Sequence, residues 1–377
     1  MRIGLNLLFV VPGETGGMET YVRALVPELA RLVGPESLRL FVSPELAAEL
    51  RPEPWFEGQQ LCELRVPGRS RVRRTLAEQS LLPVLVRRAR CELLHNLQSV
   101  APAVSGAPRS VTTIHDLLYV HHPETHSPLL RRGMRFLVPM AARRSDRIIA
   151  ISEATKADLV RTLGVTEAKI DVVHQGPGIA DTVAPSDERE LRERFSLGDA
   201  PILLSPSARR AHKNLGRLLE AFATVAAAPA PVLVLPGYAT GAEDELLDAA
   251  RRLGVADRVR FAGWVSDADL LGLYACSSAL VYPSLAEGFG LPVLEAMRSG
   301  LPVACADRTS LPEIVGDAGL LFDPESADAI AAAIGRLLSD RELAAELAAK
   351  GVHRAAGFSW ERTARETLAS YERAVGT

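Results

Sequence analysis

The fold of this chain is decided by residues 281–300, VYPSLAEGFGLPVLEAMRSG. The apolar run that leads into them, Ala279–Tyr282, is short and contains β-branched and aromatic residues, which predicts a buried strand. A glycine loop follows, and Pro292 stands where proline is preferred, in the first turn of a helix that we expect to start near Leu291. The first N–H groups of a helix lack partners within it and lie at the positive end of its dipole, so this order of elements favours an anion site.

Two carboxylates frame this turn, Glu287 before the glycines and Glu295 in the first turn of the expected helix. Two acids would repel a phosphate, so we expect them to accept hydrogen bonds from the hydroxyls of a sugar and a ribose. Gly288 and Gly290 would let the backbone approach such a ligand closely. The implied ligand is a nucleotide sugar. The alternative is an ordinary strand–loop–helix turn in which Glu295 only favours the helix start, and the residues alone do not decide between the two.

Length and composition indicate a globular protein of two domains. The chain has 377 residues, of which 47% are hydrophobic and 24% charged, and one ordinary core does not serve so long a chain. Its formal net charge of -3 argues against nucleic acid as the main partner. The four cysteines form no C-x-x-C pair, so we expect neither a disulfide framework nor a zinc site. The N-terminus begins directly with a strand pattern and lacks a signal-peptide cleavage region, which favours a cytoplasmic location.

Apolar runs alternate with helical patterns along the whole chain. Residues 3–11 are expected to be a strand, followed by a glycine loop and a helix over residues 21–32. Such alternation implies parallel, doubly wound sheets. Residues 175–187, rich in Gly, Pro and small polar residues, interrupt the pattern and are the expected linker, beyond which it restarts. The predicted fold class is therefore α/β, with two Rossmann-like domains whose strand ends face a cleft between them. The further expected strands are residues 38–42, 61–66, 93–96, 110–115, 147–151, 170–174, 202–205, 232–235, 259–261, 279–282 and 302–304.

The segment SARRAHKN, residues 207–214, follows the first expected strand of the second domain. It brings Arg209, Arg210 and Lys213 into one loop, and we expect Asn214 to cap the next helix. A solvated basic loop is the alternative for each cation. For Lys213 we favour function, because a cation and a helix dipole stabilise the charge of a departing diphosphate without a metal ion.

Candidates in the first domain are a glycine pair and a histidine. Gly16 and Gly17 end the first strand-to-helix loop. Either they form only a tight turn, or their backbone amides contact a diphosphate or the acceptor. His115 closes an expected strand, which makes it a candidate contact to the transferred sugar; a hydrogen-bonded structural histidine is the alternative. The loop after it, a candidate acceptor contact without metal spacing, contains His121, His122 and His126.

For two further patterns we favour a structural role over a functional one. Asp267 and Asp269 form a D-x-D, which suits a metal-bound nucleotide but more often caps a helix. The segment from Arg69 to Arg90 places seven arginines around an apolar stretch. A solvated helix face is the favoured interpretation, and peripheral contact with the anionic inner face of the cell membrane is the alternative. Phe358 and Trp360, before the last helix, are expected to pack.

The words TGGMETYV, TTIHDLL, DRIIAISEATKADL, HKNLGRLLEAF, YPSLAEGFGLPVLEAM and FSWERTARETL occur in this order across nearly the whole chain. Together they resemble the retaining glycosyltransferases of family 4, which have the GT-B fold, and EGFGLPVLE resembles that family's E-x7-E motif. The resemblance implies metal-independent transfer of a hexose from a nucleotide sugar, with retention of anomeric configuration. It also implies an acceptor-side domain over residues 1–178, a nucleotide-sugar-binding domain over 179–356 and a C-terminal helix, 357–377, that packs back on the first domain.

The family motif implies a role for each candidate residue. Glu287 would bind the donor sugar's hydroxyls and Glu295 the ribose. Retention is usually explained by front-face attack, in which the departing phosphate oxygen takes the acceptor's proton, so no protein nucleophile is implied. Where the family often has an arginine, five residues before the lysine, this chain has Ala208; Arg209 is the substitute we name, with Arg210 as the alternative. The other implied contacts are the backbone of Gly288, Phe289, Gly290 and Leu291 with the sugar and diphosphate, Lys213 with phosphate, Gly16 and Gly17 as the glycine loop, His115 near the sugar, and Val265 near the base.

Donor and acceptor remain open at this stage. The segment HDLLYVHHPETHSP, residues 115–128, resembles bacterial mannosyltransferases of polysaccharide assembly, so GDP-mannose is the first expectation and UDP- and dTDP-sugars are alternatives. A glycan or lipid-linked acceptor is implied, and no metal or other cofactor. Competing readings are another GT-B enzyme, such as a sugar-nucleotide epimerase or a phosphorylase, and a non-catalytic two-domain sugar-binding protein.

Overall fold

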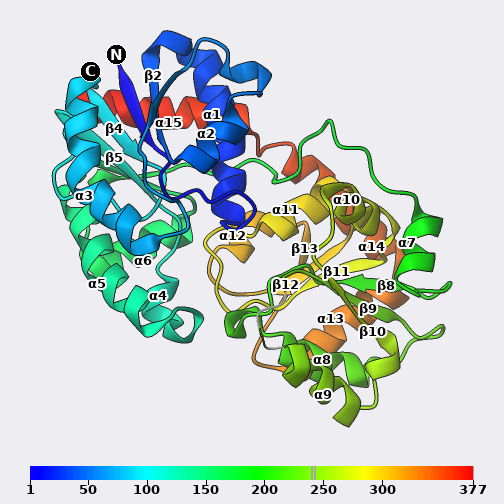
Figure 1. Cartoon of the computed structure of the whole chain (residues 1–377). Coiled ribbons are helices and arrows are strands. Elements are labelled where there is room, and N and C mark those ends of the chain that lie inside the picture. Colours follow the sequence, from blue (N-terminus) through cyan, green and yellow to red (C-terminus); the bar gives the residue numbers. More distant parts are fainter. Residues whose placement is uncertain (239–240, 242, 377) are drawn as a thin grey trace. The chain divides into compact units, whose positions relative to one another are not determined.

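The computed structural model divides into two compact units (Figure 1). It describes residues 1–238, 241 and 243–376. The first unit comprises Met1–Gly178 and Phe358–Thr377, and the second comprises Ile179–Gly357. Each unit contains one parallel sheet with helices on both faces, so each is Rossmann-like as expected.

The first unit is built on a seven-stranded sheet with the order β3-β2-β1-β4-β5-β6-β7. Strand order reverses between β1 and β4, which are hydrogen-bonded neighbours with Ile3 opposite Leu93. The loops at the carboxyl ends of these strands therefore lie at a topological switch point, where open α/β sheets bind ligands. The strands are β1 Ile3–Asn6, β2 Leu38–Val42, β3 Gln60–Glu63, β4 Leu93–Asn96, β5 Arg109–Ile114, β6 Arg147–Ala150 and β7 Ile170–Val172.

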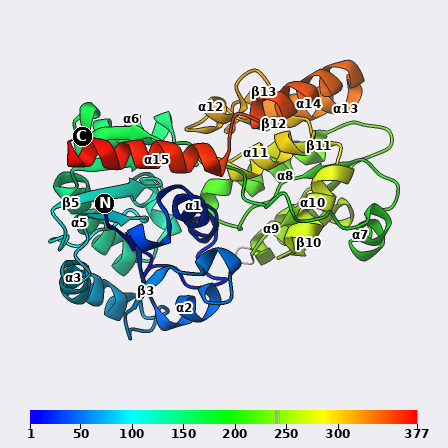
Figure 2. The same ribbon diagram turned by 90° about the horizontal axis from the view of Figure 1, so that it is seen from above.

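Helices cover both faces of this sheet because its buried side chains alternate between two sides. Leu5 and Leu93 pack into one core with α1 (Gly17–Val33) and α15 (Trp360–Val375), which lie side by side in Figures 1 and 2. Leu94 and Ile114 point to the opposite face, toward α3 (Arg71–Arg88) and α5 (Pro128–Arg144). The remaining helices of this unit are α2 Pro44–Leu50, α4 Leu118–His121 and α6 Glu153–Leu163.

The last helix, α15, belongs to the first unit, as the resemblance implied. Its Tyr371 is fully buried and its hydroxyl lies 2.7 Å from Nδ1 of His95. At its start, the ring of Trp360 packs on Tyr21 and its indole N–H donates to the carbonyl of Pro177. Trp360 approaches Gly176 so closely that a Cβ there would lie 2.7 Å from the Trp360 backbone nitrogen. The expected packing role of this aromatic residue is confirmed.

The second unit has a six-stranded sheet with the order β10-β9-β8-β11-β12-β13. Its strand order reverses between β8 and β11, and β11 is buried along its whole length. The strands are β8 Ile202–Leu204, β9 Val232–Pro236, β10 Val259–Gly263, β11 Ala279–Tyr282, β12 Val303–Ala306 and β13 Gly319–Phe322. The helices are α7 Glu188–Arg194, α8 Leu215–Thr224, α9 Glu243–Arg252, α10 Asp267–Cys276, α11 Leu291–Arg298, α12 Leu311–Val315, α13 Ala327–Ser339 and α14 Arg341–Ala355.

The first strand, β1, is shorter than the sequence predicts. The strand expected over residues 3–11 ends at Asn6. The Leu7 N–H still donates to the carbonyl of Phe41 on β2, and residues 8–10 are buried in the loop that follows. Burial produced the apolar run, and periodicity cannot separate a buried loop from a buried strand.

Within residues 1–238 and 243–376, none of the helices combines the length and the apolar content that crossing a bilayer demands.

Candidate active site

The loops that follow β8 and β11 meet at the topological switch point of the second sheet. The backbone N–H of Leu285, after β11, donates to the carbonyl of His212, after β8, at 2.8 Å. The Asn214 side chain donates to the carbonyls of Pro283 and Pro324. Asn214 stands at the N-cap position of α8, as expected, and its carbonyl accepts from the Leu218 N–H. Its side chain makes no capping hydrogen bond, because the backbone is left-handed and the amide holds two loops together instead. These bonds fix the two loops that carry the site's charged residues.

Lys213 and Glu287 form an ion pair between these loops. Lys213 Nζ lies 2.5 Å from Glu287 Oε1, and the side chains are only 15% and 12% exposed. The Tyr282 hydroxyl, at the end of β11, is 3.0 Å from the Lys213 ammonium and 2.9 Å from the same carboxylate oxygen. The structure thus brings together the two residues that sequence analysis selected on different loops.

The charge of Glu287 is maintained by its partner. Burial alone would raise the pKa of this carboxyl, but the Lys213 charge and hydrogen bond outweigh burial and hold the pKa below its usual value. Burial and the neighbouring carboxylate raise the pKa of the Tyr282 hydroxyl well above its usual value, so it stays protonated. At neutral pH the site contains a carboxylate, an ammonium and a neutral hydroxyl.

The glycine loop between Glu287 and α11 is held in a conformation that needs glycine. Gly290, directly before α11, has φ 111°, and a Cβ there would lie 2.8 Å from Leu311 Cδ2. The Ser310 hydroxyl donates to the carbonyls of Glu287 and Phe289, and the Glu287 N–H donates to Thr309 Oγ1. The start of α11 at Leu291 and Pro292 is as expected. Gly288, Phe289 and Gly290 therefore lead the chain into a helix N-terminus beside Glu287.

Glu295 lies just beyond the first turn of α11. It is the fifth residue of the helix, so the prediction that it lies in the first turn is wrong, although α11 begins at Leu291 as expected. It is 7% exposed, and the Tyr274 hydroxyl on α10 donates to its Oε2 at 2.9 Å. Neither Tyr274 nor Tyr282 was selected from the sequence. Nothing in the sequence separates them from other buried aromatic residues.

Arg209 has contacts of its own in the second unit. Its guanidinium is 1% exposed, pairs with Glu243 at 3.1 Å and donates to the carbonyls of Gly237 and Leu235. Arg210 is exposed. Val265 is half-buried and follows β10, at the same carboxyl edge of the sheet as the loops after β8 and β11. The pair that the structure brings together is therefore Lys213 with Glu287, while Arg209 is tied to β9 and α9.

The first unit places its candidates at the carboxyl edge of its own sheet. Gly16, with φ 57°, precedes α1, which begins at Gly17. His115 follows β5 and is buried; its Nε2 lies 2.9 Å from the carbonyl of Leu97, so Nε2 carries the proton, and its ring packs edge-on against Tyr21. Burial lowers the pKa of His115, which keeps the ring neutral. A neutral imidazole can donate or accept hydrogen bonds but supplies no charge.

The other patterns are occupied by local contacts. Ser266 caps α10, and Asp269 in its first turn bonds Ser186 and Arg194; the helix reading of the D-x-D is confirmed, with Ser266 rather than an aspartate as the cap. His121 pairs with Asp158 at the surface. Among the described residues, no group of three His, Cys, Asp or Glu side chains is arranged to hold a metal ion.

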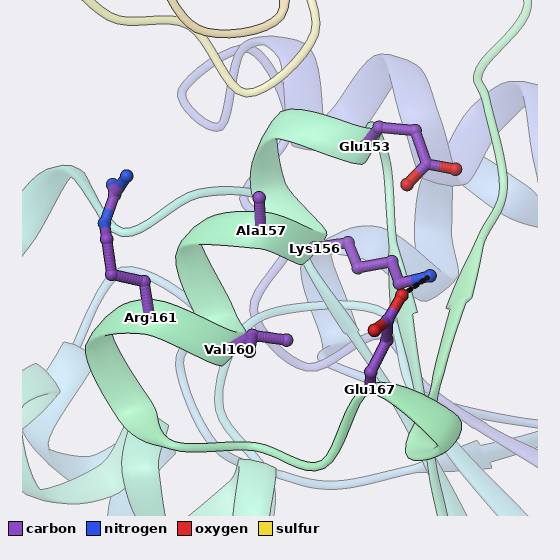
Figure 3. Close-up of a pocket in the computed structure, with 6 residues that line it drawn as sticks. All are labelled: Glu153, Lys156, Ala157, Val160, Arg161 and Glu167. Atoms are coloured by element: carbon purple, nitrogen blue, oxygen red, sulfur yellow. Dashed lines mark ion pairs between the residues drawn. The ribbon is translucent and has the colours of Figure 1, made fainter.

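A hollow on α6 lies in the first unit (Figure 3). Its Lys156 is already paired with Glu167 at 3.0 Å, and Arg161 with Asp158 at 2.8 Å. Lys156 and Arg161 are therefore already paired with acids. This makes the hollow a weaker candidate for binding an anionic ligand than the site of the second unit.

Comparison with known families covers both units. Residues 15–177 match the family described as Glycosyltransferase Family 4, and residues 187–354 match the family described as Glycosyl transferases group 1. The first match includes Gly16, Gly17 and His115, and the second includes Lys213, Glu287 and Glu295.

Individual relatives agree with the family matches. The chain is 33% identical to the O-antigen chain mannosyltransferase B of Escherichia coli over 271 residues, 70% of each chain. It is 29% identical to the MMP alpha-(1->4)-mannosyltransferase of Mycolicibacterium hassiacum, over 100% of this chain and 98% of that one. Its fold matches the crystal structure of Anabaena HepE in complex with UDP and glucose, with a TM-score of 0.75, 21% identity and coverage of 99% and 100%.

Proposed function

The chain belongs to glycosyltransferase family 4 and has the GT-B fold, and from this premise we propose that it transfers mannose from GDP-mannose to a glycan or lipid-linked acceptor, with retention and without a metal ion. The observation that carries the proposal is the Lys213–Glu287 pair at the switch point of the second sheet. The two residues come from loops 74 positions apart, and they set a cation and a carboxylate beside one helix N-terminus.

The geometry supports a division of labour within the second unit. Glu287 would accept hydrogen bonds from the hydroxyls of the donor sugar, and Glu295 from the ribose. Lys213 and the N-terminal N–H groups of α11 would stabilise the diphosphate. These two positive features would do the work for which other sites use a divalent cation, and this supports metal independence.

Transfer would proceed on one face of the sugar. The bond between the anomeric carbon and the phosphate oxygen breaks as the acceptor hydroxyl attacks from the same face. The departing phosphate oxygen takes the hydroxyl's proton, so a new glycosidic bond and a nucleoside diphosphate result. The chain's own contribution is to position the donor and to stabilise the charge that develops on the leaving group.

Mannose is favoured as the transferred sugar because the two relatives described above are named mannosyltransferases. The structural neighbour with bound UDP and glucose makes UDP-glucose the first competing donor. The experiment uses the full chain in EDTA, with GDP-mannose, UDP-glucose and dTDP-glucose supplied separately, and measures release of nucleoside diphosphate. We expect release of GDP from GDP-mannose, and we expect the rate of release to fall at least about a hundredfold in Lys213→Ala and in Glu287→Ala.

A matched control for these variants exists in the same unit. Lys350 and Glu346 form a Lys–Glu contact of 2.8 Å on α14, with side chains 43% and 59% exposed. Lys350→Ala and Glu346→Ala should turn over like the wild type. Release from none of the three donors, or release that needs added Mg²⁺, would contradict the proposal.

Membrane contact is a further part of the proposal, since a lipid-linked acceptor lies at a bilayer. The support is an apolar and basic surface on α3 and α5, which cover the same face of the first sheet. Leu76 on α3 and Leu129 and Phe136 on α5 are 62%, 75% and 70% exposed. The same two helices carry exposed arginines, namely Arg71, Arg73, Arg87, Arg88, Arg132 and Arg135. Apolar side chains among cations suit an anionic bilayer surface.

Liposome co-sedimentation tests this contact. We expect binding to vesicles that contain phosphatidylglycerol and little binding to pure phosphatidylcholine, with loss of binding in Leu76→Asp combined with Phe136→Asp. Val352→Asp is the control, because Val352 is a 48% exposed apolar residue of the second unit. Equal binding to vesicles with and without anionic lipid would contradict the proposed membrane contact. It would not affect the proposed transfer reaction.

A further inference from the structure

Two buried tyrosines contact the two acids of the E-x7-E segment, one tyrosine to each acid. Tyr282 donates to Glu287 and Tyr274 donates to Glu295, each at 2.9 Å. We propose that Tyr282 and Tyr274 are positioning residues of the donor site, which aim the carboxylate of Glu287 at the sugar and that of Glu295 at the ribose. This inference rests on the proposed function and assigns residues that the family motif does not contain.

The contact at Glu287 leaves one oxygen of the carboxylate outside the tyrosine's and lysine's bonds. Tyr282 and Lys213 both donate to Oε1, so neither of these bonds uses Oε2. Lys213 also donates to the Tyr282 oxygen at 3.0 Å, which orients the hydroxyl hydrogen toward the carboxylate. Tyr282 is 2% exposed at the end of β11, so the hydroxyl is held by a strand. The carboxylate therefore has a fixed direction relative to the sheet.

The contact at Glu295 is built from two helices. Tyr274 lies in the last turns of α10 and is 1% exposed, and its hydroxyl reaches Oε2 of Glu295 on α11. Burial and the adjacent carboxylate raise the pKa of Tyr274 well above its usual value. The hydroxyl is therefore protonated at any working pH and can only donate to Glu295. A ribose hydroxyl would then be recognised by an acid whose orientation is already set.

The two tyrosines should affect different kinetic constants. The acid that Tyr282 aims contacts the sugar, which is where bonds change, whereas the acid that Tyr274 aims contacts the ribose, which is bound equally before and during transfer. Loss of an interaction made in the transition state lowers kcat, and loss of uniform binding raises KM or Kd. A purely structural role would instead lower stability and leave no such split.

The experiment compares Tyr282→Phe and Tyr274→Phe with the wild type in the full chain. GDP affinity is measured by calorimetry and kcat with saturating GDP-mannose. We expect Tyr282→Phe to lose about tenfold or more in kcat with GDP affinity within about threefold, because hydrogen bonds to charged groups are worth roughly this much. We expect Tyr274→Phe to bind GDP about tenfold more weakly with kcat within about threefold.

Tyr371→Phe is the matched control for binding. It removes a buried tyrosine hydroxyl bonded to His95 in the first unit, and it should leave GDP affinity unchanged. Thermal unfolding of all three variants shows whether each is folded at the assay temperature.

The outcomes separate the two claims. A wild type that binds no GDP, UDP or dTDP overturns the proposed function and this inference with it. A wild type that binds and turns over, with both tyrosine variants unchanged or both lowering the same constant, overturns the inference alone.

Discussion

Replacing Glu287 by glutamine removes the negative charge opposite Lys213 while keeping the side chain's size and an acceptor oxygen. The two charges are 2.5 Å apart and 15% and 12% exposed, so the variant leaves a largely buried ammonium without a counter-charge. Breaking such a pair costs about 3–5 kcal/mol, and we expect the lower end because Tyr282 still accepts from Lys213. For a unit of this size, about 3 kcal/mol corresponds to a fall in Tm of roughly 6–12 °C.

A double-mutant cycle isolates the pair itself. Lys213→Met combined with Glu287→Gln leaves neither charge, so the double variant should lose about 2 kcal/mol less than the sum of the single losses. The assay is urea unfolding of the free protein followed by circular dichroism. The corresponding cycle on Lys350 and Glu346, an exposed pair, should give a coupling below about 0.5 kcal/mol. Single losses at Lys213 and Glu287 that add within about 0.5 kcal/mol would refute the reasoning, since the pair would then be no more coupled than the exposed one.

Three further predictions concern stability. Burial raises the pKa of the Glu78 carboxyl to about 7 from 4.5, so between these pH values only the folded state keeps the proton. The free energy of unfolding should therefore fall by about 3 kcal/mol as pH rises from 4.5 through 7. Urea unfolding at pH 5, 6, 7 and 8 measures this fall, and Glu78→Gln should abolish it. Gly290→Ala should lower Tm by several degrees and weaken GDP binding in calorimetry, because its φ is 111° and the new Cβ meets Leu311; equal GDP affinity would argue against a role for the loop. Gly176→Ala should destabilise the first unit by about 2 kcal/mol or more in thermal unfolding, since the Cβ meets the backbone nitrogen of Trp360 as well as its indole ring; an unchanged Tm would contradict this.

The sequence predicted strand bounds well where the apolar run ended at the same residue as the hydrogen-bonded strand. Strands β2, β4 and β11 have the expected bounds. Polar or turn-forming residues bracket β2 and β11, namely Ser37 and Ser43, and Ser278 and Pro283. The strand expected over residues 3–11 was too long, because the loop after Asn6 is as apolar as the strand. Periodicity reports burial, and only hydrogen-bond pairing distinguishes a strand from a buried loop.

The site was predicted in its residue types but not in its contacts. Lys213 and Glu287 were selected separately, and their pairing depends on β8 lying next to β11, which is a property of strand order. Asn214 precedes a helix as predicted, yet its left-handed backbone sends the amide to loop carbonyls instead of the helix. Tyr274 and Tyr282 could not be separated from ordinary core aromatics, because only the structure shows their hydroxyls on the two acids.

The central claim is that the second unit binds a nucleotide sugar through Lys213, Glu287 and the N-terminus of α11. The most direct measurement is thermal unfolding of the full chain in EDTA against GDP, UDP, dTDP and GDP-mannose. Ligand at about a hundred times its Kd adds about 2.7 kcal/mol, so we predict a rise in Tm of several degrees with GDP and GDP-mannose that disappears in Lys213→Ala. No rise with any of these nucleotides, or an equal rise in Lys213→Ala, would contradict the account.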